Sequence, residues 1–266
     1  ASLGDQIPAL VVGRRIHQPA LPLIGRQETV EQETAALTAG PTVRVLGGPA
    51  GVGKTRVGSE IAERLAAAGR PVIWCTCDRW GELLSPIPDL FTSARSLVPG
   101  GIARDQVPPL DAIFAHSPGE AAGPPLDAEL LRVRLRDAVE QLLQGVTAGT
   151  VVVVDDLQWI SGDAAALLAR LVTGPVAVGW LLLCRSTDQT PACQQLLAEL
   201  ARHAHNLDDI EPLHDHEVGQ LCHAVDPSVP APVVTDLVRR ADGNPFVTIE
   251  LTRHTGRGGE PGSIPP

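Results

Sequence analysis

Residues 48–55 read GPAGVGKT, and this spacing of residue types suits the binding of a phosphate chain. Glycines let the backbone curl, so that successive N–H groups point inward at phosphate oxygens. Lys54 can reach the β- and γ-phosphates of a nucleotide, and the hydroxyl of Thr55 can ligate Mg²⁺. The pattern therefore predicts a site for a nucleotide together with Mg²⁺, placed between a strand and a helix.

A second group of chemically capable residues is the acid pair Asp155 and Asp156, which ends an apolar run of valines. The first carboxylate can hold Mg²⁺ through water, and the second can orient or deprotonate an attacking water. The alternative is that the two acids only cap the helix that follows. Together with the glycine loop, the pair predicts Mg–nucleotide binding, whereas hydrolysis needs a further step that these residues permit without requiring it.

Arg185 ends the next apolar run, LLLCRS. In a parallel sheet, the carboxyl ends of the strands converge on the ligand crevice, so a cation there could contact the γ-phosphate. An ordinary surface arginine at a strand end is the other interpretation, and position alone leaves both open.

The elements that must position these residues alternate between strand and helix up to residue 211. Apolar, β-branched runs indicate buried strands, and amphipathic stretches indicate helices between them. We therefore predict a three-layer α/β sandwich of the P-loop NTPase type with a mostly parallel sheet, followed by a small all-helical lid. The predicted strands are residues 42–47, 71–77, 150–156, 176–187 and 206–213, and the predicted lid helices are 214–225, 230–241 and 245–254.

The predicted division of the chain follows from this order. It comprises an irregular lead-in (1–22), a nucleotide-binding α/β domain (23–211), the helical lid (212–254) and a disordered Gly- and Pro-rich tail (255–266). Part of residues 78–126 is expected to be a loose insertion, because it is rich in Pro and Gly.

Composition narrows the function classes. The 266 residues carry a formal net charge of −10, so the basic footprint of a nucleic-acid-binding domain is absent. No signal peptide or membrane-spanning run is visible, and the five cysteines suit reduced thiols, so we expect a cytoplasmic protein without membrane partners. Cys75 and Cys77 are interpreted as alternate residues of a buried strand, and His214, His216 and His223 as solvated residues, rather than as metal ligands.

Several motifs in chain order resemble those of one family. LIGRQ, GGPAGVGKTR, VVVVDDLQW, LLLCRS and DGNPF are similar to motifs in the nucleotide-binding domain of signalling P-loop ATPases of the STAND class, within the AAA-like group. The large LuxR-type bacterial transcriptional regulators match best, over roughly residues 22–254.

The resemblance implies roles for further residues. Ile24, Gly25 and Arg26 match an opening motif that packs near adenine, and Arg185 matches a sensor arginine. Gly243, Asn244 and Pro245 match a lid motif whose proline contacts the base, although a turn before a helix would also explain them. The residues expected to bind nucleotide are Ile24, Gly25, Arg26, Pro49, Ala50, Gly51, Val52, Gly53, Lys54, Thr55, Arg56 and Pro245. Those expected to hold Mg²⁺ are Thr55 and Asp155, and those expected in catalysis are Lys54, Asp156 and Arg185.

The functional expectation is a regulatory domain that binds ATP or ADP and switches conformation, with slow Mg²⁺-dependent hydrolysis. Expected partners are the nucleotide, further copies of the chain and other domains of a full-length regulator. DNA is expected to be contacted only through a C-terminal domain that this sequence does not contain. The alternatives are a small-molecule kinase, an assembly module without hydrolysis, or a hexameric motor. A motor would need an intersubunit arginine, for which Arg239 and Arg240 are candidates, although adjacent helical arginines are commonly just solvated.

Overall fold

The computed structural model describes residues 11–12, 21–79, 84–98, 128–203 and 206–256. Within these ranges the strands form one sheet in which every neighbouring pair is parallel, in the order β1-β3-β4-β5-β2-β6. The strands are β1 (Val11–Val12), β2 (Val43–Gly47), β3 (Val72–Thr76), β4 (Val151–Asp155), β5 (Gly179–Leu183) and β6 (Asn206–Asp209).

The central strands are apolar because both faces of the sheet are covered. Every residue of β4 and β5 is buried, which is typical of parallel sheets packed between helices. The strand β6 lies at the edge of the sheet, as its more polar sequence predicts, and Leu207 within it is 43% exposed. All five predicted strands are therefore present, which confirms the predicted α/β sandwich.

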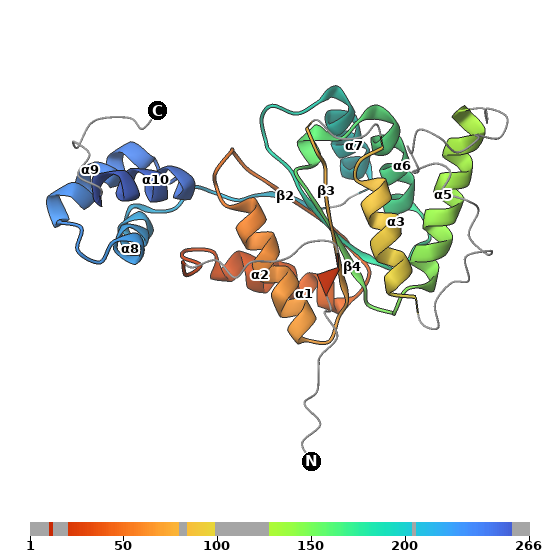
Figure 1. The fold of residues 1–266 in the computed structure, drawn as a ribbon, viewed down its shortest axis with the longest axis horizontal. Helices are drawn as coiled ribbons and strands as arrows, with labels where there is room; N and C mark the ends of the chain where they lie inside the picture. The colour runs from red at the N-terminus through yellow and green to blue at the C-terminus, as the bar shows by residue number, and fades with distance from the viewer. Residues whose placement is uncertain (1–10, 13–20, 80–83, 99–127, 204–205, 257–266) are drawn as a thin grey trace, which may run out of the picture.

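Helices cover the two faces of the sheet unequally, as Figure 1 shows. One face carries α1 (Gln27–Ala39) and α2 (Lys54–Ala67), whose apolar residues form a cluster with the sheet. The other face carries the remaining helices of this domain, which are α3 (Ile87–Ser96), α5 (Ala128–Gly145), α6 (Gly162–Thr173) and α7 (Pro191–Arg202).

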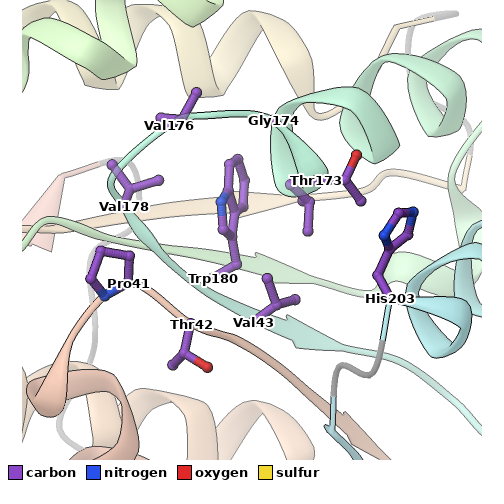
Figure 2. A pocket seen from close by; sticks show the side chains of 10 residues that line it. Pro41, Thr42, Val43, Thr173, Gly174, Val176, Val178, Trp180 and His203 are labelled. Carbon is purple, nitrogen blue, oxygen red and sulfur yellow. The ribbon is translucent and has the colours of Figure 1, made fainter.

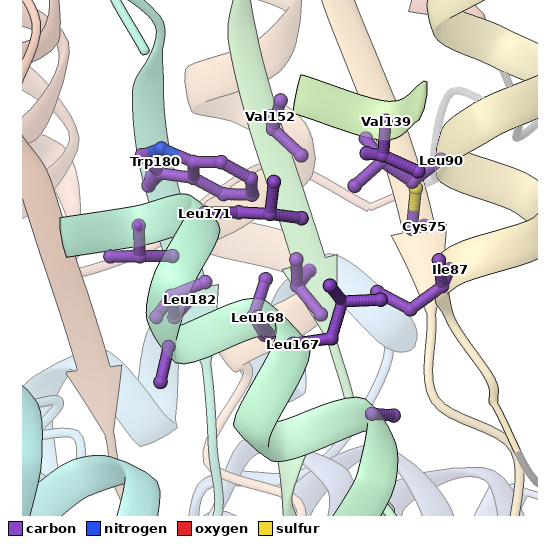
Figure 3. Close-up of a cluster of buried hydrophobic side chains, with 14 of the residues drawn as sticks. Cys75, Ile87, Leu90, Val139, Val152, Leu167, Leu168, Leu171, Trp180 and Leu182 are labelled. Carbon is purple, nitrogen blue, oxygen red and sulfur yellow. The ribbon is translucent and has the colours of Figure 1, made fainter. Parts of the chain in front are cut away.

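The larger hydrophobic core lies under this second group of helices. In Figure 3, Leu167, Leu168 and Leu171 of α6 lie against Val152 and Trp180 of the sheet. These side chains are at most 8% exposed, so the core packs α6 tightly against β4 and β5.

The lid is a separate helical unit with its own core. It comprises α8 (Asp215–Val225), α9 (Ala231–Ala241) and α10 (Pro245–Gly256), within one residue of the predicted starts. Its core includes Leu221, Leu237 and Leu251. Leu21 and Ile24, from the segment that precedes α1, pack against this core. The lid lies at one end of the molecule, beside the loop that joins β2 to α2 (Figure 1).

Three features differ from the sequence-based expectations or cannot be compared with them. Val11–Val12 pair with Val72 and Ile73, so part of the lead-in predicted to be irregular is a short strand. The helix α3 lies in the Pro- and Gly-rich stretch of which part was expected to be loose, and its side chains Ile87 and Leu90 are buried. Residues 80–83 and 99–126 of that stretch, and residues 257–266 of the predicted disordered tail, lie outside the described residues.

No helix among the described residues combines the length and the apolarity that crossing a bilayer requires.

Candidate nucleotide-binding site

The glycine loop joins the carboxyl end of β2 to the amino end of α2. Gly51 and Gly53 have φ angles of 80° and 104°, a left-handed conformation that residues with a Cβ rarely adopt. The helix α2 begins at Lys54, directly after Gly53, so its positive dipole end faces the space enclosed by the loop. This local geometry is the anion-binding arrangement that the sequence pattern predicts.

Lys54 lies inside the loop and is only 8% exposed. Its Nζ donates hydrogen bonds of 2.8 Å to the carbonyl oxygens of both Gly48 and Pro49. Burial lowers the pKa of Lys54, and the nearby positive charge of Arg185 lowers it further. The two carboxylates of the acid pair partly offset both effects, and a polyphosphate would add further negative charge beside this ammonium group.

Thr55 and Asp155 meet where α2 begins and β4 ends. The Thr55 hydroxyl donates to the Asp155 carboxylate, at 3.0 Å from Oδ2 and 3.2 Å from Oδ1. The backbone N–H of Asp156 also donates to Asp155 Oδ1 at 2.9 Å, which fixes the orientation of the carboxylate. A hydroxyl and a carboxylate side by side form the oxygen donor set that Mg²⁺ prefers, so these residues fit the predicted metal site.

Asp156 adopts a left-handed backbone conformation, with φ 54° and ψ 36°. Aspartate tolerates this conformation better than most residues, and such outliers occur at functional sites. Its carboxylate accepts a hydrogen bond of 2.8 Å from the side-chain amide of Gln158.

Gln158 is a residue of the site that the sequence-based reasoning missed. It is fully buried, at 0% exposure, in the short 3₁₀ turn Leu157–Trp159. Its Oε1 accepts from the backbone N–H of Arg185 at 3.1 Å, so one side chain touches both Asp156 and the end of β5. A polar side chain among apolar neighbours, two positions after the acid pair, was the available signal.

Arg185 follows β5, and its guanidinium carbon lies 5.5 Å from the centre of the Trp159 ring, at cation–π distance. Arg79 lies over the same ring at 4.7 Å. Arg185 also lines the cavity described below and contributes to the electrostatic environment of Lys54. The structure therefore places the predicted sensor arginine with the glycine loop.

One cavity of about 590 Å³ connects these groups, within the usual size range of small-molecule sites. It lies between the glycine loop, the segment before α1 and the lid. The predicted site residues that line it are Ile24, Arg26, Ala50, Gly51, Val52, Gly53, Lys54, Thr55, Arg56, Asp156, Arg185 and Pro245. Of the other predicted residues, Gly25 and Pro49 are next in sequence to lining residues. Asp155 does not line the cavity but accepts a hydrogen bond from Thr55, which does.

The lid contributes one wall of this cavity through Pro245, Phe246, Ile249 and Arg253. Phe246 is 62% exposed, an unusual exposure for a large apolar side chain, and sequence-based reasoning had not selected it. An exposed aromatic ring beside a phosphate loop could cover an apolar group such as a base.

The opening motif also lines this cavity, through Ile24 and Arg26. Arg26 is 8% exposed, and its Nε and Nη2 atoms are buried without a hydrogen-bond partner. Burial lowers the pKa of this guanidinium, against the opposing influence of Glu217 and then Glu211. A buried cation with unsatisfied donors at a cavity wall is the kind of group that an acceptor on a ligand would satisfy.

Other candidates do not form sites. His214 and His216 stack with ring centres 5.9 Å apart, but no group of three or more metal-ligating side chains occurs in the described part of the chain. Arg239 and Arg240 both pair with Asp236 on α9 and do not line the nucleotide cavity.

Cys75 and Cys77 are buried free thiols, as expected for alternate residues of a strand and its end. Burial raises the pKa of both thiols, which favours their protonated form.

A second cavity of about 380 Å³ lies near the amino ends of β2 and β5, away from the nucleotide cavity at their carboxyl ends. Figure 2 shows the Trp180 indole between Val178 and Thr173. The lining of this second cavity, which includes Thr42, Trp180 and His203, offers no counterpart to the phosphate loop or the acid pair.

Comparisons with known proteins agree with the fold and the loop. Residues 22–183 match a family model described as "AAA ATPase domain". No curated protein sequence matches the chain. Leaving out β1, the strand order β3-β4-β5-β2-β6 is the one typical of this fold, with a helical region following the sheet.

Among solved structures, the ORC2 protein of Aeropyrum pernix, in ADPNP–ADP complexes, has 13% identity and a TM-score of 0.56. The alignment covers 92% of this chain and 67% of that chain. A RuvB variant of Thermotoga maritima has 14% identity and a TM-score of 0.50, with 90% and 66% covered.

A STAND protein of Pyrococcus horikoshii that carries a tetratricopeptide repeat sensor has 16% identity and a TM-score of 0.50. The alignment covers 87% of this chain but only 30% of that one. This chain therefore spans about two thirds of the RuvB variant and under a third of the STAND protein. At these identities the likeness shows the fold alone.

Proposed function

This chain belongs to the family of AAA ATPase domains, and on that premise we propose that it is the nucleotide-dependent switch of a LuxR-type transcriptional regulator of the STAND class. In this proposal the domain binds ATP or ADP in the cytoplasm, and slow Mg²⁺-dependent hydrolysis of ATP resets the switch. Other domains or copies of the regulator read its state, and a separate C-terminal domain contacts DNA. The motifs LIGRQ, VDDLQW and DGNPF support this finer assignment.

The observation that carries the proposal is the direct contact between the lid and the phosphate loop. Asn244 Nδ2 donates to the carbonyl of Ala50 at 2.9 Å, and the N–H of Phe246 donates to the carbonyl of Gly51 at 3.3 Å. A nucleotide in the cavity would touch both units, so ligands that differ in their contacts with the two units would favour different lid positions. A switch needs this differential contact.

The hydrolytic half of the proposal assigns a role to each side chain. Mg²⁺, when bound at Thr55 and Asp155, supplies charge stabilisation for the transferred phosphoryl group. Lys54 and Arg185 contact phosphate oxygens, and Asp156 orients the water that attacks the γ-phosphorus and accepts its proton. The bond between the γ-phosphorus and the bridging oxygen breaks, and ADP and phosphate leave.

The remaining cavity residues are assigned to the nucleoside. Ile24 and Arg26 of the opening motif and Pro245 of the lid also line the cavity. We expect Pro245 and Ile24 to contact the base and Arg26 to donate to an acceptor on the nucleotide.

The test is hydrogen–deuterium exchange of the phosphate loop and of α10, with ADP, with a non-hydrolysable ATP analogue and with neither, followed by phosphate release with ATP. We expect the two nucleotides to give different protection of α10, and turnover below about one per second, the low end of typical enzymes. Asp156→Asn should keep binding and lose phosphate release. Asp137→Asn, an exposed acid on α5, is the matched control. Identical protection of α10 in all three states would refute the switch.

A further inference from the structure

The side chain of Gln158 connects the carboxyl ends of two neighbouring strands. Its Nε2 donates to Asp156 Oδ1 at 2.8 Å, after β4, and its Oε1 accepts from the N–H of Arg185 at 3.1 Å, after β5. Its backbone carbonyl also accepts from the N–H of Thr190, the residue that caps α7, at 3.2 Å. Three segments therefore converge on a single residue.

A primary amide fits both side-chain contacts, because it carries a donor and an acceptor. The ionised Asp156 carboxylate can only accept a hydrogen bond, and the Arg185 N–H can only donate one. A carboxylate at position 158 could serve Arg185 but would repel Asp156, and an apolar side chain could serve neither. The partners thus fix which end of the amide faces which strand.

The conformation of Asp156 makes this contact important. Its backbone is left-handed at φ 54°, and within its own turn the side chain is held by Gln158. Without that hydrogen bond the carboxylate could rotate away from the cavity that it lines. Misplacement of a reacting group by about 1 Å can lower a rate on the order of a hundredfold.

We propose that Gln158 is a positioning residue that holds the Asp156 carboxylate toward the attacking water and couples it to the position of Arg185. This inference rests on the proposed function, because it assigns Asp156 the role of aligning water. When Arg185 shifts toward or away from a γ-phosphate, the amide transmits the shift of its backbone to the acid. Sensing of the nucleotide and alignment of water are then linked through one side chain.

Two variants separate the two contacts. Gln158→Glu keeps an acceptor for the Arg185 N–H but removes the donor to Asp156 and adds a like charge. Gln158→Met has a similar volume and removes both contacts. Gln195→Glu is the matched control, because it makes the same charge change at an exposed position of α7.

The first readout separates binding from turnover. We expect both variants to keep the dissociation constant for ADP within about threefold, and to lower phosphate release by about ten- to a hundredfold. Gln158→Glu should lower kcat with little change in KM, because only the alignment of the attacking water is lost. A merely structural role would weaken ADP binding together with turnover. Equal turnover in all four proteins would overturn the proposal.

The second readout does not depend on activity. Exchange of the Arg185 amide, followed by NMR, should stay slow in the unaltered chain and in Gln158→Glu, and become faster in Gln158→Met. Equal protection in all three overturns the coupling to Arg185. If the unaltered chain binds ADP but releases no phosphate, the hydrolytic part of the proposed function fails. The coupling would then be supported or rejected by amide exchange alone.

Discussion

The hydroxyl of Thr55 lies 3.0 Å from the Asp155 carboxylate, although 100 positions separate the two residues in the chain. Thr55 is placed by the start of α2, and Asp155 by the last position of β4. The strands β2 and β4 are not neighbours, since β5 lies between them, so the meeting depends on the sheet order. This pair is the most direct structural support for a Mg²⁺ site.

Asp155→Asn should uncouple nucleotide binding from magnesium. Loss of the negative charge weakens the attraction for Mg²⁺, and second-shell changes alone commonly reduce metal affinity by about tenfold or more. We expect Mg²⁺ to strengthen ADP binding in the unaltered chain and to have little effect in the variant, as measured by calorimetry with Mg²⁺ or with a chelator. An equal effect of Mg²⁺ in both proteins would place the metal elsewhere.

We expect the affinity for nucleotide to depend on pH through the charge of Lys54. Burial lowers the pKa of its ammonium group, whereas bound phosphate favours the charged form and raises that pKa. Binding therefore takes up protons, and affinity should fall as the pH rises above neutrality toward the ordinary lysine pKa of about 10.4.

Calorimetry in buffers of different ionisation enthalpy measures this proton uptake. Lys54→Arg should lack the dependence on pH and on buffer, because arginine stays charged across the same range. Affinity that rises with pH in the unaltered chain would contradict this account of Lys54.

We expect replacement of Arg26 to weaken the binding of ADP. Its buried Nε and Nη2 atoms lack partners, so replacement by methionine should remove no hydrogen bond from these atoms in the free protein. If a nucleotide satisfies them, Arg26→Met should weaken ADP binding by about tenfold, which corresponds to about 1.4 kcal/mol.

Thermal unfolding with and without ADP provides the measurement, since a ligand raises stability according to its affinity. The ADP-dependent rise in the midpoint should be smaller in Arg26→Met than in Arg239→Met, which changes an exposed arginine outside the cavity. Equal rises would mean that Arg26 makes no net contribution to ADP affinity.

Much of the fold follows from local patterns. The valine run of β4, the edge character of β6 and the three lid helices could all be predicted. Burial on both faces of a strand leaves a continuous apolar run, and burial of one helical face leaves a periodic pattern. The helix α3 was not predicted, because the stretch that contains it is rich in Pro and Gly, and Pro88 lies in its first turn. At the first turn of a helix, proline removes no needed hydrogen bond. The strand β1 has only two residues and therefore no pattern to detect.

The phosphate loop and the acid pair were predictable for a different reason, since their chemistry constrains adjacent residues. Gln158 and Phe246 were not predicted, because their importance comes from what the fold places beside them. The contact between Gln158 and Arg185 depends on the pairing of β4 with β5, which no sequence spacing encodes.

Asn244 both links the lid to the phosphate loop and caps α10, and one substitution can separate these two roles. Its Oδ1 accepts from the N–H groups of Phe246 and Val247 at the start of α10, while its Nδ2 reaches Ala50. Asn244→Asp keeps the acceptor for the cap and loses the donor to the loop.

One hydrogen bond contributes about 0.5–1.5 kcal/mol, so Asn244→Asp should shift the balance toward an undocked lid by about two- to tenfold. Hydrogen exchange of the loop amides should therefore be faster in this variant, whereas the α10 amides keep their protection. Loss of protection in α10 as well would mean that the residue acts mainly as a helix cap.

The central claim is that residues 48–55 hold the phosphates of a nucleotide. Titration calorimetry of ADP with Mg²⁺, on the unaltered chain and on Lys54→Ala, tests it most directly. The account predicts measurable binding to the unaltered chain and a loss of at least about tenfold in Lys54→Ala, because a charged hydrogen bond to phosphate contributes about 1.5–3 kcal/mol. Binding that is unchanged by Lys54→Ala, or no binding to the unaltered chain, would contradict it.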